Sequence, residues 1–142
     1  MNFLKKLFAK GEEPLSVYDD PVLGRTEWSA DDEAWIGAYQ QVRFALAYDR
    51  EARPTPRLLS YARDVLGDPA WLSSTLEEEK ALAAKSSPDL RSEIAGLKLG
   101  LVHFAISKGR EYIIASVEGG NDPRCWRIEY HGRKCDGLGF DT

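Results

Sequence analysis

The chain of 142 residues has few of the residues that staple small proteins or hold metals: two cysteines, Cys125 and Cys135, and two histidines, His103 and His131. Two cysteines are too few for a disulfide scaffold and suit the reducing cytoplasm, where we expect the protein. No apolar run approaches the roughly 20 residues of a membrane-spanning helix. The chain also lacks a surplus of positive charge, with 19 Lys and Arg against 23 Asp and Glu. That balance argues against a nucleic-acid binder, whose affinity depends on such a surplus.

What the chain does have is an ordinary globular composition, 43% hydrophobic and 30% charged. Its length predicts one domain that can bury a core without staples. We place this domain at residues 15–142, after an N-terminal amphipathic segment and linker at residues 1–14. In residues 1–10 the apolar side chains fall on one helical face, which suits either a membrane or partner anchor or a short helix docked on the domain. A docked helix or a frayed end is favoured over an anchor, since one weak apolar signal seldom gives stable anchoring.

Residues 19–49 predict a β-meander. Three strands are expected, at residues 22–28, 34–39 and 42–48. The last alternates most clearly, with Val42, Phe44 and Leu46 on one side. Turn residues and an acidic loop separate the strands, at Asp19-Asp20-Pro21, 29–33 and Gln40-Gln41. Strands this close in sequence, joined by short polar loops, pair antiparallel.

The middle of the chain predicts three helices. Each begins with a capping residue followed by proline, at Thr55-Pro56, Asp68-Pro69 and Ser87-Pro88. They are expected to end near Gly67, Lys85 and Gly96. Strand patterns then return at residues 97–106, 111–117, 125–130 and 133–140. Two meanders with about three helices between them predict an α+β domain, an antiparallel sheet with the helices packed on one side.

The segment DPVLGRTEW…DDEAWIG…VRFALAYD resembles the opening of a group of uncharacterised bacterial domains. Those domains start with an Asp-Pro-apolar-apolar-Gly turn, followed by an acidic loop, a Trp-x-Gly strand and an alternating strand. The matching residues are Asp20, Pro21, Gly24, Asp32, Trp35 and Gly37. The match covers the first third of the chain well and the rest in outline. Some proteins of this kind look like immunity proteins encoded beside toxins, so the resemblance implies a non-catalytic binding protein and brings no catalytic residues.

The acidic loop is the candidate binding site. Asp31, Asp32 and Glu33 are consecutive carboxylates, although such charge runs are most often a solvated face. Trp35 follows the loop and is the tryptophan we most expect to be partly exposed. Complementary charge speeds association, and an aromatic anchor supplies affinity. We therefore predict that Asp31, Asp32, Glu33 and Trp35 form an acidic patch for another protein with a basic surface, such as a toxin, without a cofactor.

The cysteines and histidines leave an alternative, a small enzyme with a Cys/His site. A zinc site is disfavoured because the chain has no C-x2-C pair. If His131-Gly132 forms a two-residue turn, Cys125 lies opposite Leu138 and on the other face of the hairpin from Cys135, which also disfavours a disulfide. No organised motif surrounds a Cys and a His, as nucleophilic catalysis requires.

A third alternative is a small-ligand groove lined by aromatic side chains, which are plentiful: four Trp, six Tyr and five Phe. Trp28, Trp71 and Trp126 each lie on an apolar face of their element, so we expect them in the core. The sequence therefore predicts a protein-binding domain first, of the immunity or adaptor type, with the Cys/His enzyme and the aromatic groove as alternatives.

Overall fold

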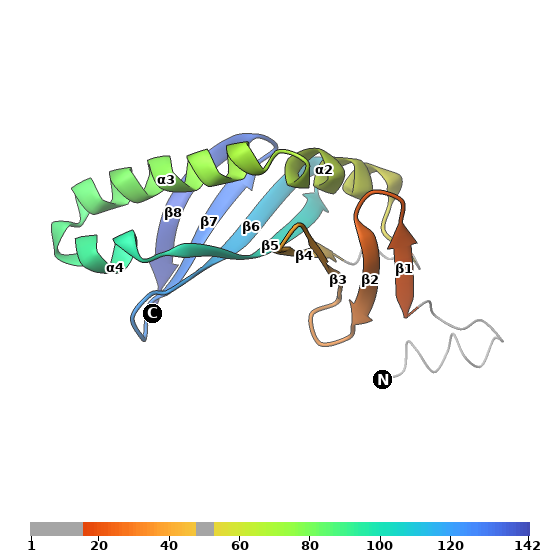
Figure 1. The fold of residues 1–142 in the computed structure, drawn as a ribbon, viewed down its shortest axis with the longest axis horizontal. Helices are drawn as coiled ribbons and strands as arrows, with labels where there is room; N and C mark the ends of the chain where they lie inside the picture. The colour runs from red at the N-terminus through yellow and green to blue at the C-terminus, as the bar shows by residue number, and fades with distance from the viewer. Residues whose placement is uncertain (1–15, 48–52) are drawn as a thin grey trace.

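The computed structural model describes residues 16–47 and 53–142, in which a layer of helices covers one face of an eight-stranded sheet (Figure 1). The strands are β1 (Val17–Asp20), β2 (Gly24–Ser29), β3 (Ala34–Tyr39), β4 (Val42–Ala47), β5 (Lys98–Ser107), β6 (Arg110–Glu118), β7 (Cys125–His131) and β8 (Lys134–Asp141). Between β4 and β5 lie α2 (Pro56–Leu66), α3 (Pro69–Ser86), the 3-10 turn η1 (Pro88–Leu90) and α4 (Arg91–Ala95). The predicted α+β class is confirmed. The predicted segment 1–14 lies outside the described residues.

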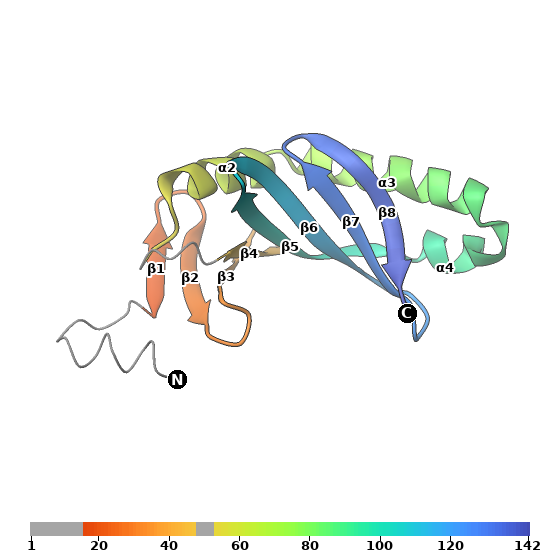
Figure 2. The ribbon, with the colours of Figure 1, turned by 180° about the vertical axis from the view of Figure 1, so that it is seen from behind.

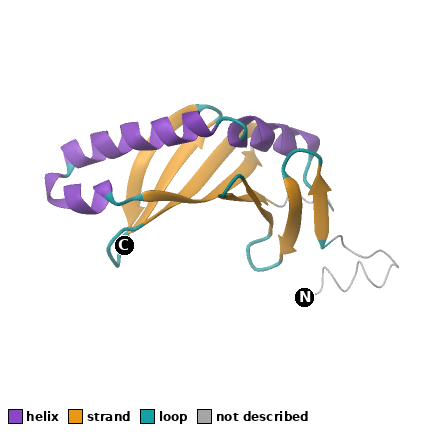
Figure 3. Ribbon diagram, in the orientation of Figure 1, coloured by secondary structure: helices purple, strands orange, loops and turns teal. Residues whose placement is uncertain are grey.

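The sheet follows chain order from β1 to β8, and neighbouring strands are antiparallel except at its centre. There β4 and β5 run parallel, with Phe44 opposite Val102 and Leu46 opposite Phe104. A parallel pair needs a long crossover connection, which the helical segment supplies. The two meanders are therefore halves of one sheet, and the crossover carries the helices over one of its faces (Figure 3).

The helices begin at the capping signals in the sequence. The Thr55 hydroxyl accepts a hydrogen bond from Leu58 N–H at 3.3 Å, and the Asp68 carboxylate accepts one from Trp71 N–H at 3.3 Å. A proline follows each cap, where it costs no intrahelical hydrogen bond. The third predicted helix is the 3-10 turn η1 followed by α4. No helix in the described part of the chain has both the length and the apolar character for a membrane crossing.

The core lies between the helices and the sheet face that they cover. From the sheet it receives buried side chains on alternate residues, including Phe44, Leu46, Val102, Phe104, Ile113, Ala115, Ile128 and Tyr130. From α2 and α3 it receives Leu58, Leu59, Ala62, Val65, Leu72 and Leu76. Each large apolar side chain buried in this way contributes about 1.5–3 kcal/mol. We call the opposite side of the sheet the open face, since none of the described helices covers it (Figure 2).

The turn between β1 and β2 is built around a buried aspartate. The Asp20 carboxylate accepts hydrogen bonds from the N–H groups of Val22 and Leu23, both at 2.9 Å. Gly24 closes the turn with a φ of 80°, a conformation that favours glycine. From α2, Arg63 donates through Nε to Asp20 Oδ2 at 3.0 Å and through Nη2 to Oδ1. The Asp20 side chain is 0% exposed, so this ion pair fixes the β1–β2 ribbon to the helices.

The environment of Asp20 keeps it ionised. Burial would raise the pKa of this carboxyl, but hydrogen bonds from Arg63, Leu23 and Val22, together with the Arg63 charge, outweigh burial and lower the pKa to about 2.

A second buried carboxylate, Glu93 of α4, holds the loop between β6 and β7. It accepts hydrogen bonds from Arg124 Nε at 3.0 Å, from Trp126 Nε1 at 2.6 Å and from Asn121 N–H at 3.0 Å. The Arg124 hydrogen bond, aided by those from Trp126 and Asn121, outweighs burial and lowers the pKa of Glu93 to about 2. A carboxylate engaged by three partners is a structural anchor for this loop.

Two details of the sequence prediction are wrong. Where a turn was expected at Asp19-Asp20-Pro21, β1 extends to Asp20 and pairs with β2. The last hairpin turns at Gly132-Arg133, one residue later than predicted, because Gly132 has a positive φ of 58° and so takes the first position of the turn. His131 therefore lies opposite Lys134, and a bulge follows.

The shifted turn changes which residues lie opposite the two cysteines, but each cysteine stays on the predicted face of the hairpin. Cys135 lies opposite Tyr130, and Cys125 lies opposite Asp141 instead of Leu138. Tyr130 is buried against the helices whereas Cys125 is exposed. The two cysteines therefore lie on opposite faces of the hairpin, as expected, and both are free thiols.

Candidate functional site

The predicted acidic patch lies in the tight turn between β2 and β3, which we call the acidic turn (Asp31–Glu33). All three carboxylate residues are exposed. Ser29 Oγ donates to Asp32 Oδ2 at 2.8 Å and accepts from Asp32 N–H at 3.3 Å, which holds the turn in shape. Glu33 has a positive φ of 49°. The ion pairs among the described residues include none of the three carboxylates, so their charge faces solvent.

Trp35 does not belong to this surface, and its predicted exposure is wrong. Its side chain is 3% exposed. β3 alternates so that Trp35 lies opposite Leu46 on the helix-covered face, and also opposite Trp28. Its ring meets that of Trp28 edge-on at 5.4 Å and that of Tyr18 at 6.4 Å between centroids. Trp35 is therefore a core residue, and the exposed part of the predicted site is reduced to its carboxylates.

The acidic turn lies beside the open face. Strand register places Ile36 opposite Ala45 and Ala45 opposite His103, so these three side chains form one row across β3, β4 and β5. Burial lowers the pKa of His103, and the negative charge of Asp32 acts in the opposite direction. Asp32 is thus within electrostatic reach of this row. A protein that contacted the acidic turn would also meet the half-buried Ile36 and His103, while Ala45 between them is buried.

The cysteines and histidines are not brought together. His131 and His103 point to the open face, whereas Cys135 shares the opposite face with Tyr130. Cys125 and His131 stand at opposite ends of β7, six residues or about 20 Å apart. Burial raises the pKa of the Cys135 thiol to about 11, which disfavours the thiolate that a nucleophile needs. In residues 16–47 and 53–142 no group of three or more His, Cys, Asp or Glu side chains is arranged to hold a metal ion.

The tryptophans do not line a common groove either. Trp126 is buried beside Phe140 at one end of β7, and Trp71 packs on Tyr130 at the other. Trp126 and Tyr130 are four residues apart, or about 13 Å along the strand. As expected, Trp126 lies in the core, and Trp28 and Trp71 are partly buried against it.

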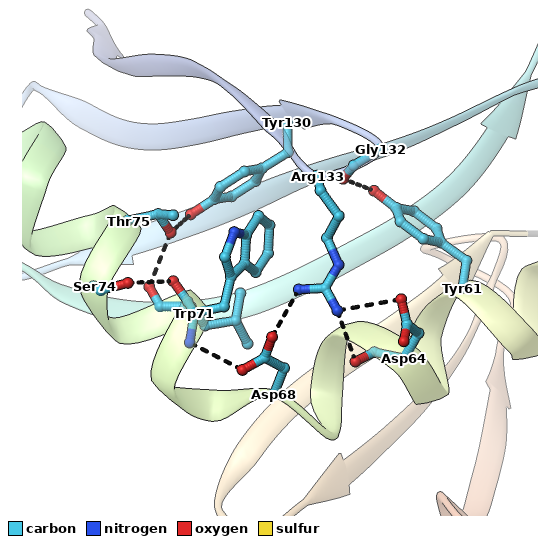
Figure 4. A network of polar contacts seen from close by, with 10 residues as sticks. Tyr61, Asp64, Asp68, Trp71, Ser74, Thr75, Tyr130, Gly132 and Arg133 are labelled. Atoms are coloured by element: carbon cyan, nitrogen blue, oxygen red, sulfur yellow. Dashed lines mark hydrogen bonds and ion pairs between the residues drawn. The ribbon is translucent and has the colours of Figure 1, made fainter.

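A polar network between the β7–β8 turn and the helices was not anticipated from the sequence (Figure 4). Arg133 donates to Asp68 at 3.1 Å and to the side chain and carbonyl of Asp64 at 3.2 and 3.1 Å. Its guanidinium lies 4.6 Å from the centre of the Trp71 ring. Beside it, the Tyr61 hydroxyl donates to the Gly132 carbonyl at 2.8 Å. Both terminal nitrogens of the Arg133 guanidinium have partners on the helices, so the network fastens the β7–β8 turn to the corner between α2 and α3.

Comparison with protein-family models, with curated proteins and with solved structures finds no match. The resemblance to uncharacterised bacterial domains therefore stays a prediction. The residues that carry the resemblance nonetheless have structural roles. Asp20 and Gly24 shape the first turn, and Trp35 lies in the core.

Proposed function

We propose that this is a non-catalytic protein-binding domain of the immunity or adaptor type, acting in the cytoplasm. The acidic turn would dock on a basic surface of the partner, for example that of a toxin. One observation carries the proposal: three consecutive exposed carboxylates, Asp31, Asp32 and Glu33, occupy a hydrogen-bonded turn and form no ion pair with a described residue. Charge presented in this way accelerates the encounter with an oppositely charged protein.

The neighbourhood of the turn supports the same proposal. Docked there, a partner would cover part of the row that contains Ile36 and His103. Burial of Ile36 would contribute affinity and the carboxylates would contribute association rate. The dispersed cysteines and histidines give no comparable support to the Cys/His enzyme, and the dispersed tryptophans give none to an aromatic groove.

The test is binding between the full-length protein and the product of the adjacent gene, followed by surface plasmon resonance. We expect the triple variant Asp31→Asn, Asp32→Asn, Glu33→Gln to associate at least about tenfold more slowly, with a flatter dependence on salt. Absence of a complex with any neighbouring product, or a triple variant that associates at the original rate, would refute the proposal.

A matched control separates local docking from net charge. Asp19, Glu78 and Asp89 are exposed and form no ion pair with a described residue. Neutralising these three changes the net charge as much as neutralising the acidic turn. The control variant should associate at close to the original rate. An equal loss in both variants would mean that total charge, not the acidic turn, attracts the partner.

A further inference from the structure

A basic hollow lies on the open face where β5 turns into β6. It is open to solvent, has a volume of about 410 Å³ and is lined by Ser107, Lys108, Arg110, Tyr112 and His131. Each of these five side chains carries a hydrogen-bond donor or a group that can become one, and no carboxylate is among the described lining residues. In a chain with more acidic than basic residues, this group of donors is a distinct chemical environment.

Strand register explains why these side chains converge. Ser107 lies opposite Arg110, and Tyr112 lies opposite His131. Since alternate residues of a strand share a face, Arg110 and Tyr112 both point to the open face. The connecting turn has only two residues, Lys108 and Gly109, with φ of 52° and 74°, as in the tight hairpin turns that keep flanking strands in register.

The cations of the hollow are available to a ligand. Neither Lys108 nor Arg110 forms an ion pair with a residue of the described chain. His131 contacts Asp136 through Nδ1, which leaves Nε2 for a ligand. The nearest acidic residue in sequence, Glu111, alternates to the other face and lies 4.0 Å from Arg57. Asp136 therefore faces His131, whereas the charges of Lys108 and Arg110 meet no carboxylate partner among the described residues.

We propose that the basic hollow binds a phosphate-type oxyanion, the phosphomonoester group of a small molecule. A guanidinium offers two parallel donors to such a group, an ammonium adds a point charge, and the Ser107 and Tyr112 hydroxyls add neutral donors. An oxyanion with several acceptor oxygens can bind these donors together, since they come from the β5–β6 hairpin and from the adjacent strand β7. This site is separate from the acidic turn and does not depend on the partner proposed above.

The test is a titration of the full-length protein with inorganic phosphate at constant ionic strength, followed by backbone amide chemical shifts. We expect saturable shifts confined to residues 107–112 and His131. Arg110→Gln should weaken the affinity by about tenfold, as loss of a hydrogen bond between charged groups does. Lys98→Gln, at the other end of β5, removes a cation that likewise forms no ion pair with a described residue and should leave the affinity unchanged.

A second variant guards against loss of the fold. Asparagine tolerates the positive φ of Lys108 better than lysine does, so Lys108→Asn should bind phosphate more weakly without losing stability. Shifts that remain linear in phosphate, or an affinity that Lys98→Gln lowers as much as Arg110→Gln does, would overturn the proposal.

Two further ligands distinguish the source of the phosphate group. Glycerol phosphate presents it on a soluble molecule, and vesicles with phosphatidic acid present it on a lipid. Tighter binding of glycerol phosphate than of inorganic phosphate would support a soluble ligand. Binding to the vesicles alone would overturn that part of the proposal and identify a lipid headgroup.

Discussion

Replacing Asp20 with asparagine tests the ion pair that joins the β1–β2 turn to α2. Asparagine retains the size of the side chain and an oxygen that can accept the N–H groups of Val22 and Leu23. It removes the charge that faces Arg63. The pKa of Asp20 falls from an ordinary 3.8 to about 2 in the folded protein, and that difference corresponds to roughly 2 kcal/mol of folding stability at neutral pH. We expect Asp20→Asn to lower the free energy of unfolding by about this amount.

The dependence on pH provides a sharper measurement than the magnitude. Because the folded-state pKa is depressed, the stabilisation is fully present above the unfolded value near 4. It is lost as the pH falls from about 4 to about 2. Urea unfolding followed by tryptophan fluorescence should therefore show the wild type and Asp20→Asn converging across this range. The contribution of Glu93, which titrates in the same range, cancels in the difference between the two proteins.

Asp19→Asn is the matched control for this experiment. Asp19 is the adjacent residue of β1 and is exposed, so its substitution should change stability by less than about 0.5 kcal/mol. The reasoning would be refuted if both variants cost the same. It would also be refuted if the gap between wild type and Asp20→Asn did not change between neutral and acid pH.

Three further changes probe single residues. Gly37→Ala would place a Cβ atom 2.8 Å from Phe44 Cζ and should cost about 1–3 kcal/mol in urea unfolding; an unchanged midpoint would mean that the ring moves freely. Gln41 has a φ of 71°, so Gln41→Gly should stabilise the protein by roughly 0.5–1 kcal/mol, and a loss of stability would contradict this. Since burial raises the pKa of Cys135 to about 11, iodoacetamide should modify Cys135 more slowly than the exposed Cys125 when peptides are followed by mass spectrometry. Equal rates would count against the buried placement of Cys135.

Much of the fold could be predicted because its signals are local. Thr55-Pro56 and Asp68-Pro69 specify helix starts within two residues of sequence, and the structure places both caps there. Gln40-Gln41 was expected to form a turn, and both residues have positive φ. Such signals depend on the backbone of the segment itself and need no knowledge of the rest of the chain.

What could not be predicted depends on distant parts of the chain. β1 is a short strand, and its pairing with β2 is reinforced by Arg63, 43 residues after Asp20 in the sequence. The parallel contact between β4 and β5 and the network around Arg133 likewise join segments far apart in sequence. No local sequence pattern predicts contacts between segments so far apart. They account for the missed strand and the unanticipated network.

Trp35 shows the same limit within the candidate site. Its position close behind three carboxylates suggested exposure, but strand alternation determines which face of the sheet its side chain takes. Residues of β3 point alternately to the two faces of the sheet, and Leu46 lies opposite Trp35 on the helix-covered face. Had the strand been paired one residue out of register, Trp35 would have faced the other way. The sequence identified the turn correctly and could not determine which neighbour of the turn faces solvent.

The residues of the DPxxG…WxG motif stabilise the fold, which distinguishes them from the charged residues proposed to bind partners. Asp20, Gly24 and Trp35 each stabilise a turn or the core, so a protein could share them for structural reasons alone. The acidic turn and the basic hollow are different, since most of their charges meet no partner among the described residues. Neutralising those unpaired charges should therefore leave urea unfolding nearly unchanged while altering binding, whereas Asp20→Asn should do the reverse. If neutralising the acidic turn or the basic hollow instead destabilised the fold, their charges would have a structural role, and both binding proposals would lose their basis.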